Sequence, residues 1–308
     1  MPARFHWPRV LNDFRRCVGP MTDDPFVAHR SLLFTVAYEM LGSATDAEDV
    51  LQEAWLRWAD VDHSQVRDPR AYLIRVVTRQ ALNQMRTLAR RREEYVGEWL
   101  PEPLLTSPDV AEDVELAESV SIAMLTVLET LGPTERAVFV LREVFEMPYG
   151  EIAEAIGKSA AAVRQIALRA REHVAARRPR VHVSRPEQQA VVERFLVALR
   201  TGQLQELMEV MAPDVVLIAD GGGLVAAARA PIHGAERVAK LLARADRVLG
   251  GFDATAVWLN GAPAGRIEID GQLAAVSLVV ENGRVTRIYA VANPRKLTRL
   301  DEPAELAR

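Results

Sequence analysis

The chain has 308 residues, 49% of them hydrophobic and 26% charged, which excludes a mainly disordered protein and predicts two or three domains. One cysteine, Cys17, excludes a disulfide framework or a multi-cysteine metal site, and no apolar stretch approaches the ~18 residues of a membrane-spanning helix. The net charge of −4 argues against nucleic-acid binding by the chain as a whole, but the charges are strongly segregated along it.

The expected protein is therefore soluble and cytoplasmic, without a membrane anchor. Its six histidines are too scattered along the chain to predict a metal site, and no cofactor is expected. Residues 1–21 contain no apolar core of the kind that a secretory signal needs. We predict a disordered tail there, or an upstream start codon with Met21 as the true start; a basic arm at Arg15 and Arg16 that touches DNA is the alternative.

The segment 22–95 has the pattern of long amphipathic helices, because apolar residues recur every three or four positions. One helix is predicted to begin after Gly42-Ser43, and it carries four acids and no base between positions 44 and 53. Another opens at Asp68-Pro69 and carries six arginines and no acid between positions 75 and 92.

These two helices of opposite charge call for different partners. DNA would repel the acidic helix, so we expect it to face a basic protein surface. Amide side chains lie among the arginines of the second helix, and this mixture suits the reading of bases while phosphates are held. A basic face that is merely solvated is the alternative for that helix.

Residues 96–118 are predicted to form a linker, because three prolines interrupt the helical pattern. The motif Trp99-Leu100-Pro101-Glu102-Pro103 places large apolar side chains where a simple spacer needs none. These side chains are expected either to cover the adjacent domain or to dock another segment.

Helices return in residues 119–180, where Tyr149 to Val174 have the pattern of a helix-turn-helix. Gly157 suits the tight turn, Ser159 is placed to cap the second helix, and Val163 and Ile166 point toward the first helix. The outward face of the second helix, which would enter a major groove, presents Ala161, Ala162, Arg164, Gln165, Leu168, Arg169 and Arg171. Arginine pairs with guanine and glutamine with adenine, so Arg164 and Gln165 are the candidate base readers. An ordinary helical hairpin with a basic face is the alternative.

Residues 181–300 are predicted to form an α+β domain, followed by a C-terminal tail at 301–308. Two helices, at about 186–200 and 203–211, precede strand-like runs at 215–219, 255–259, 266–269, 273–280 and 284–291. Glu281-Asn282-Gly283 predicts a hairpin turn. Helices followed by such strands indicate an antiparallel meander packed against helices.

The helical segments together resemble the extracytoplasmic-function (ECF) sigma factors of bacterial RNA polymerase. Residues 46–55 look like the helix that binds core polymerase, residues 68–73 with Asn83 and the following arginines look like the segment that reads the −10 promoter element, and residues 131–142 with the helix-turn-helix look like the −35 module. The resemblance covers about residues 24–178. It implies two all-α sigma domains, called region 2 and region 4, with core RNA polymerase and promoter DNA as partners and no catalytic residue.

The resemblance implies three sets of binding residues. Core polymerase would be bound by Asp46, Asp49, Gln52 and Glu53. The −10 element would be read by Arg75, Arg79, Asn83, Arg86, Arg90 and Arg91. The −35 element would be read by Ser159, Ala161, Ala162, Arg164, Gln165, Arg169 and Arg171.

Three further motifs resemble the signatures of the SigJ-like subgroup, which carries a fused C-terminal domain of the SnoaL/NTF2-like type. They comprise Trp99, Leu100 and Pro101 of the linker, Asp220, Gly221, Gly222 and Gly223, and Asn293, Pro294, Lys296 and Leu297. Leu224 and Arg295 depart from the subgroup, in which a basic residue follows the glycines and an acid follows Asn-Pro. Ile166 stands where an arginine is more typical. We predict that the three motifs meet and that the C-terminal domain modulates initiation in cis.

Other functions remain open at this point. No Gly-Lys-Ser/Thr follows Asp220-Gly221-Gly222-Gly223, which argues against a phosphate loop. The C-terminal domain could instead be a ligand-binding sensor, or a small-molecule isomerase or hydrolase with Asp220 and His233 as candidate catalytic groups. A stand-alone repressor would use the helix-turn-helix but would leave the acidic helix without a role.

Overall fold

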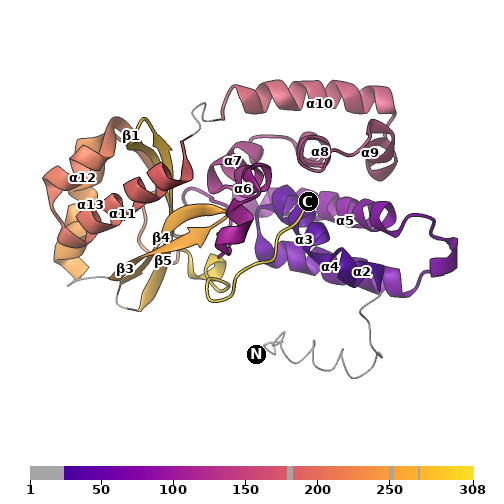
Figure 1. Ribbon diagram of the computed structural model, residues 1–308, viewed down its shortest axis with the longest axis horizontal. Coiled ribbons are helices and arrows are strands. Elements are labelled where there is room, and N and C mark those ends of the chain that lie inside the picture. The colour runs from indigo at the N-terminus through magenta and orange to yellow at the C-terminus, as the bar shows by residue number, and fades with distance from the viewer. Residues whose placement is uncertain (1–23, 179–182, 250–252, 270) are drawn as a thin grey trace.

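The structure, a computed structural model, describes residues 24–178, 183–249, 253–269 and 271–308. Two helical units lie side by side on the right of Figure 1, and a sheet with three helices lies on the left. The expected tail at 1–21, including Met21, and residues 179–182 at the expected second domain boundary lie outside the described residues. None of the described helices is both long and apolar enough to cross a membrane.

The first helical unit consists of α2 (Pro25–Ala28), α3 (Arg30–Leu41), α4 (Ala44–Ala59), the 3₁₀ turn η1 (His63–Gln65) and α5 (Pro69–Glu93). In this unit, α4 and α5 begin where the sequence predicts. Gly42 ends α3 in the left-handed conformation, and the hydroxyl of Ser43 caps α4 by accepting the N–H of Asp46 at 3.1 Å. Asp68 accepts the N–H of Ala71 at 3.0 Å, so α5 opens at Pro69 with a capped first turn.

The second helical unit starts earlier than expected. Its elements are the 3₁₀ turn η2 (Pro108–Ala111), α6 (Val114–Val120), α7 (Ile122–Leu128), α8 (Pro133–Phe139), the π-helical turn η3 (Val140–Val144), α9 (Tyr149–Ile156) and α10 (Ala160–Ala175). Helical structure therefore resumes inside the segment expected to be a linker. The helix α6 begins there because Asp113 caps it: its carboxylate accepts the N–H of Leu116 at 3.0 Å.

The C-terminal unit is the expected α+β domain with a mixed sheet. Its elements are α11 (Arg185–Thr201), α12 (Leu204–Val210), β1 (Met211–Asp220), β2 (Ile232–His233), α13 (Ala235–Leu249), β3 (Asp253–Leu259), β4 (Ala262–Ile269), β5 (Gln272–Glu281), β6 (Arg284–Val291) and the 3₁₀ turn η4 (Pro294–Lys296). The strand order is β2-β1-β6-β5-β4-β3. Strands β3 to β6 form the predicted antiparallel meander, and Asn282 and Gly283 take the positive φ values of its hairpin turn.

The expectation of a wholly antiparallel sheet is wrong for β1, which pairs with β6 in parallel. The short strand β2 and the helix α13, both absent from the sequence prediction, stand between β1 and the meander in the chain. They allow the chain to cross over and place β1 beside the last strand, because parallel pairing requires a long connection. This pairing puts the end of β1, at Asp220, next to the end of β6.

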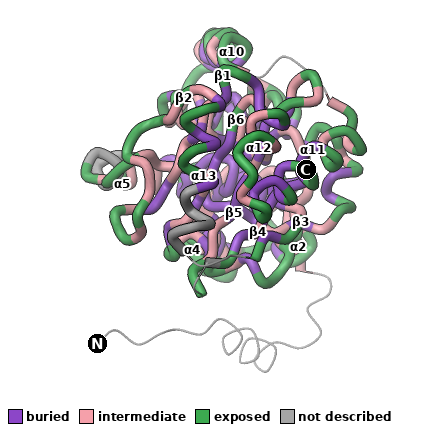
Figure 2. The backbone as a smooth tube through the Cα atoms, turned by 90° about the vertical axis from the view of Figure 1, so that its left-hand side faces the viewer, coloured by how far each residue is buried: buried purple, intermediate pink, exposed green. Residues whose placement is uncertain are grey.

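Both faces of the sheet are covered. On β5, Val276, Leu278 and Val280 belong to a buried cluster with α11, α12 and α13, whereas Ala275 and Val279 belong to a second cluster on the opposite face. This alternation follows from the two-residue period of a strand. Figure 2 shows α12 and α13 in front of the largely buried sheet. The second cluster contains Leu100 of the linker and Leu297, so the outer face of the sheet docks against the rest of the chain.

The two helical units share one apolar core. Leu33 and Val36 of α3, Leu104 of the linker and Val138 of α8 belong to a single buried cluster that extends to Val163 of α10. We call this arrangement of the two units the closed state. In the closed state α9 contacts α5, on the right of Figure 1.

A buried polar group lies in this shared core. The guanidinium of Arg136 on α8 donates to the backbone carbonyl of Glu39 at 2.8 Å and forms an ion pair with Glu129, and the hydroxyl of Ser119 donates to the carboxyl group of Glu39 at 2.8 Å. Burial raises the pKa of Glu39 to about 8 and lowers that of Arg136 to about 9. The positive charge is thus matched by Glu129, and Glu39 is held neutral below pH 8.

This pKa shift gives the closed state a pH dependence with a definite sign. Because the pKa of Glu39 is higher in the folded chain than its ordinary value of 4.5, the free energy of unfolding should fall as the pH rises from about 5 to about 8, by on the order of a few kcal/mol. Urea unfolding at several pH values measures this slope. In the variant Glu39→Gln, which lacks this carboxyl group, the free energy of unfolding should fall less steeply between pH 5 and pH 8. Equal slopes in the two proteins would contradict the assignment.

Candidate functional site

The acidic face of α4, formed by Asp46, Asp49, Gln52 and Glu53, lies on the surface. The last three are exposed, and Asp46 is half-buried and accepts a hydrogen bond from the amide of Gln84 at 3.0 Å. Partial burial and the neighbouring carboxylates raise the pKa of Asp49. Because nearby positive charges would stabilise these carboxylates, the acidic face suits a basic partner.

The arginine-rich helix α5 presents part of its expected DNA face to α9. Arg75 forms an ion pair with Glu154 at 3.1 Å, and Arg79 donates to the backbone carbonyls of Glu154 and Ala155 at 2.8 and 3.0 Å. Those carbonyls lie at the C-terminal end of α9, where the helix dipole favours a cation. The closed state therefore engages two arginines expected to read the −10 element in bonds to α9, although Arg75 is only half-buried and Arg79 stays exposed.

The other expected −10 residues lie further along α5. Asn83 and Arg86 are both exposed, and the guanidinium of Arg86 donates to the amide oxygen of Asn83 at 3.1 Å. The side chains of Arg90 and Arg91 lie outside the described part of the structure. Among the described side chains of this basic face, Arg75 and Arg79 contact α9.

The helix-turn-helix has the predicted geometry. Gly157 takes a φ of 69° at the end of α9, and the hydroxyl of Ser159 caps α10 by accepting the N–H of Ala162 at 3.2 Å. Val163 and Ile166 are buried against the first helix. Of the residues expected to face DNA, Ala161, Arg164, Gln165, Leu168, Arg169 and Arg171 are exposed and Ala162 is half-buried. Arg171 also lies 3.7 Å from the carboxylate of Glu143.

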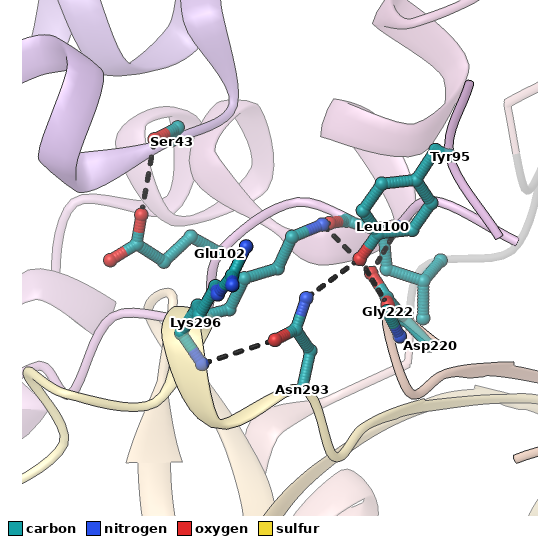
Figure 3. Close-up of polar contacts among 9 residues, drawn as sticks. Ser43, Tyr95, Leu100, Glu102, Asp220, Gly222, Asn293 and Lys296 are labelled. Atoms are coloured by element: carbon teal, nitrogen blue, oxygen red, sulfur yellow. Dashed lines mark hydrogen bonds and ion pairs between the residues drawn. The ribbon is translucent and has the colours of Figure 1, made fainter. Parts of the chain in front are cut away.

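The three signature motifs meet around one buried carboxylate, that of Asp220 (Figure 3). It accepts hydrogen bonds from the hydroxyl of Tyr95 at 2.6 Å, the backbone N–H of Leu100 at 2.9 Å and the backbone N–H of Gly222 at 3.0 Å. The ammonium of Lys296 completes the set at 2.7 Å. Asp220 has no exposed surface, so its charge is balanced entirely by these donors. We call this cluster the junction.

Lys296 ties the junction to the linker. Its ammonium lies 3.9 Å from the ring centre of Trp99 and 5.1 Å from that of Tyr95, and it donates to the backbone carbonyl of Leu100 at 2.5 Å. The amide of Asn293 donates to the hydroxyl of Tyr95 at 2.8 Å. Burial, together with the carboxylate of Asp220, raises the pKa of Tyr95, which therefore stays a hydrogen-bond donor.

The glycines of the second motif are required by close approach. A Cβ on Gly222, whose φ is +59°, would lie 2.3 Å from the amide nitrogen of Asn293, and one on Gly221 would lie 2.4 Å from the carbonyl oxygen of Val225. A Cβ on Gly223 would lie 3.1 Å from Val96 of the linker. A side chain at Gly222 would push the second and third motifs apart, and one at Gly221 would displace the loop at Val225.

The remaining motif residues frame the junction. Pro101 is buried in the linker, Pro294 opens η4, and Leu297 is buried in the same cluster as Leu100. Two residues depart from the subgroup pattern. Leu224 is 52% exposed, and the backbone N–H of Arg295 donates to the side-chain oxygen of Asn293, which closes the turn. The ion pair of the junction is made by Lys296 and does not depend on either position.

Sequence reasoning missed a second contact, made by Asn260 at the tip of the β3–β4 hairpin. Its side chain donates to the hydroxyl of Tyr38 on α3 at 2.7 Å and to the carbonyl of Val120 at the end of α6 at 2.8 Å, and accepts the N–H of Leu104 in the linker at 2.9 Å. Asn260 is 1% exposed and has a φ of +53°. One turn of the C-terminal domain therefore holds region 2, the linker and region 4 together. The only sequence signal was an Asn-Gly pair between two strands.

The last residues of the chain also reach the helical units. The N–H of Ala304 donates to the carbonyl of Leu105 at 2.8 Å, and the N–H of Ala307 donates to the hydroxyl of Thr35 on α3 at 3.1 Å. Arg308 pairs with Asp113 at 3.0 Å and with Glu115. The segment expected to be a tail is thus packed across α3, as the yellow trace in Figure 1 shows.

The groups that an enzyme would need are not arranged for catalysis. Asp220 is fully buried and engaged by the junction, whereas His233 is exposed on the short strand β2. The inner face of the sheet is filled with aliphatic side chains such as Leu217, Val276 and Ile288. Among the described residues, no cluster of three or more His, Cys, Asp and Glu side chains is placed to hold a metal ion.

Comparison with known proteins agrees with this geometry. The family models Sigma-70 region 2 and Sigma-70, region 4 match residues 26–91 and 121–174. The chain is 37% identical to the ECF RNA polymerase sigma factor SigJ of Mycobacterium tuberculosis, over 89% of this chain and 92% of that protein, and 34% identical to the probable ECF sigma factor SigI of the same organism, over 88% and 92%. The crystal structure of M. tuberculosis SigJ superimposes with a TM-score of 0.72 at 33% identity, covering 89% of this chain and 97% of that one.

Proposed function

This chain belongs to the ECF RNA polymerase sigma factors, and on that premise we propose that its C-terminal domain controls, within the same molecule, the initiation that the two helical units direct. As a sigma factor, the chain binds core RNA polymerase and directs promoter-specific transcription initiation; it is not an enzyme. It acts where the polymerase and the promoter are, in the bacterial cytoplasm.

The binding residues follow from exposure and charge. We assign core polymerase to the acidic face of α4. We assign the −35 element to the outward face of α10, where Arg164 and Gln165 reach base edges and Arg169 and Arg171 hold phosphates. We assign the −10 element to the basic face of α5, which begins with Arg75 and Arg79.

Regulation follows from the closed state. While Arg75 and Arg79 are bonded to α9, they are not available to promoter DNA, and the two reading units are not free to move apart. The observation that carries the proposal is the position of Asn260, which bonds α3, the linker and α6 at once. The C-terminal domain thereby stabilises the closed state and limits −10 reading until the turn is released. The C-terminal domain, which we take to be of the SnoaL/NTF2-like type, acts in this proposal as a clamp.

The variant Asn260→Ala tests this proposal. It removes the side-chain partner of the buried N–H of Leu104 and of the carbonyl of Val120, which costs about 1–3 kcal/mol per group and shifts the chain toward an open state. The hydroxyl of Tyr38 loses one of its two hydrogen bonds and keeps the one to the carbonyl of Glu102. We expect run-off transcription with core polymerase to rise several-fold. Energy transfer between dyes at Asp60→Cys, the residue that follows α4, and Glu172→Cys on α10, in a Cys17→Ser background, should fall.

The matched control is Asn282→Ala. Asn282 also occupies a hairpin tip with a positive φ, of 52°, but it is exposed at the β5–β6 turn. It should leave both transcription and energy transfer at the level of the parent chain. If Asn260→Ala behaves like this control, the C-terminal domain does not restrain initiation through the closed state.

A further inference from the structure

Glu102, in the centre of the linker motif, is built into the first turn of the acidic helix. Its carboxylate accepts the backbone N–H groups of Ala44 at 2.8 Å and Thr45 at 3.2 Å. It also accepts the hydroxyl of Ser43 at 3.2 Å, the contact drawn in Figure 3. The side chain reaches these groups from 58 positions away in the sequence. It thus satisfies helix N–H groups that have no partner within α4.

The backbone of the same residue is also fixed. The N–H of Glu102 donates to the carbonyl of Gly42 at 2.9 Å, and its carbonyl accepts the hydroxyl of Tyr38 at 2.7 Å. A Cβ on Gly42 would lie 3.0 Å from the ring of Trp99. Glu102 is 2% exposed, so the linker packs tightly over the turn between α3 and α4.

The junction fixes the linker two residues before this contact. Leu100 is bonded on both sides of its peptide backbone, by Asp220 at its N–H and by Lys296 at its carbonyl. Two residues of extended chain span only about 7 Å, so a movement of the junction is passed to Glu102 with little slack. A second contact reinforces the path, because Arg299 lies 3.4 Å from the carboxylate of Glu48 on α4.

We propose that Glu102 is a positioning residue for polymerase docking, through which the C-terminal domain fixes the first turn of α4 and the angle of its acidic face. The carboxylate holds the N-terminal N–H groups of the helix, where a negative charge is favoured, and so keeps Asp46 and Asp49 in their docking positions. This inference rests on the proposed cis control by the C-terminal domain. Through Glu102 the C-terminal domain also acts on the polymerase-binding face of α4 and supports docking there.

The test compares Glu102→Gln with its parent in the full chain. The amide keeps the shape and one acceptor but removes the charge. We expect the dissociation constant for core RNA polymerase to rise roughly tenfold, while affinity for a −35 duplex stays unchanged because α10 is untouched. Amide hydrogen exchange at Ala44 and Thr45 should accelerate. The matched control is Glu112→Gln, an exposed glutamate of the same segment, which should alter none of these readouts.

A double-mutant cycle separates positioning from simple stabilisation. Glu102→Gln and Asp220→Asn should weaken polymerase binding non-additively, since both act on one path. If Glu102→Gln lowers the unfolding midpoint but leaves polymerase affinity unchanged, Glu102 is only a structural cap and the inference is overturned. If at the same time Asp220→Asn alters transcription, cis control stands and only its route through α4 fails. If neither variant alters polymerase binding or transcription, both proposals fail.

Discussion

Replacing Asp49 and Glu53 together by arginine is expected to weaken binding to core RNA polymerase by at least about 100-fold. Both side chains are exposed on the acidic face of α4, and reversing them places like charge against a basic surface, which costs several kcal/mol. Burial, and after it the neighbouring carboxylates, raise the pKa of Asp49, and both side chains are exposed, so the reversal should not unfold α4. Binding is measured by titration of labelled core enzyme, and transcription should fall in parallel.

A control of equal charge change is available on α11. Glu187 and Glu193 are exposed there, and the variant carrying Glu187→Arg and Glu193→Arg should keep its polymerase affinity. Binding of the −35 duplex should persist in both doubly reversed proteins. If reversal on α4 has no more effect than reversal on α11, the acidic face is not the docking surface, and a repressor that needs only the helix-turn-helix becomes the better account.

The largest effect on stability is expected at the junction, from Asp220→Ala. This change leaves the ammonium of Lys296, whose side chain is 11% exposed, without its buried partner, and it frees the donors of Tyr95 and Leu100. Removing one member of a buried ion pair costs about 3–5 kcal/mol. Urea unfolding should record the loss, and hydrogen exchange should show the linker released from the sheet.

The matched double variant distinguishes charge from packing. Asp220→Ala combined with Lys296→Met removes the stranded charge, so it should be more stable than Asp220→Ala alone. The exposed ion pair of Lys240 with Glu236 on α13 provides the control, and its removal should cause no measurable change. If the single and double variants at the junction are equally destabilised, the ion pair does not hold the junction and the apolar contacts of Leu100 and Leu297 do.

Several features of this fold are determined by residues that lie close together in the sequence. The turn of the helix-turn-helix needs a left-handed residue and a cap, and Gly157 and Ser159 supply them within three positions. The start of α5 is set by Asp68-Pro69 in the same way. The meander of β3 to β6 follows from strands and turns that are neighbours in the chain. The junction could also be anticipated, because its three motifs resemble those of a known subgroup.

The near-continuous apolar run of β5 is typical of a strand that is buried on both faces. Strands of an antiparallel sheet usually alternate when one face meets solvent, whereas β5 buries Ala275 and Val279 on one face and Val276 and Leu278 on the other. Such a strand indicates that something packs on both faces of the sheet. The sequence thus implied a docked C-terminal domain, although it did not say what docks against it.

The sequence alone determined which surfaces carry charge and where capped helices such as α4, α5 and α10 begin, because these depend on residues at most a few turns apart. The tertiary structure alone decided that Arg79 bonds the end of α9, that Asn260 joins three segments and that Glu102 caps a helix 58 positions away. A lone asparagine or glutamate has no periodicity and no local partner that marks its role. Its role arises only when folding removes water from around it and leaves distant backbone groups as the available partners.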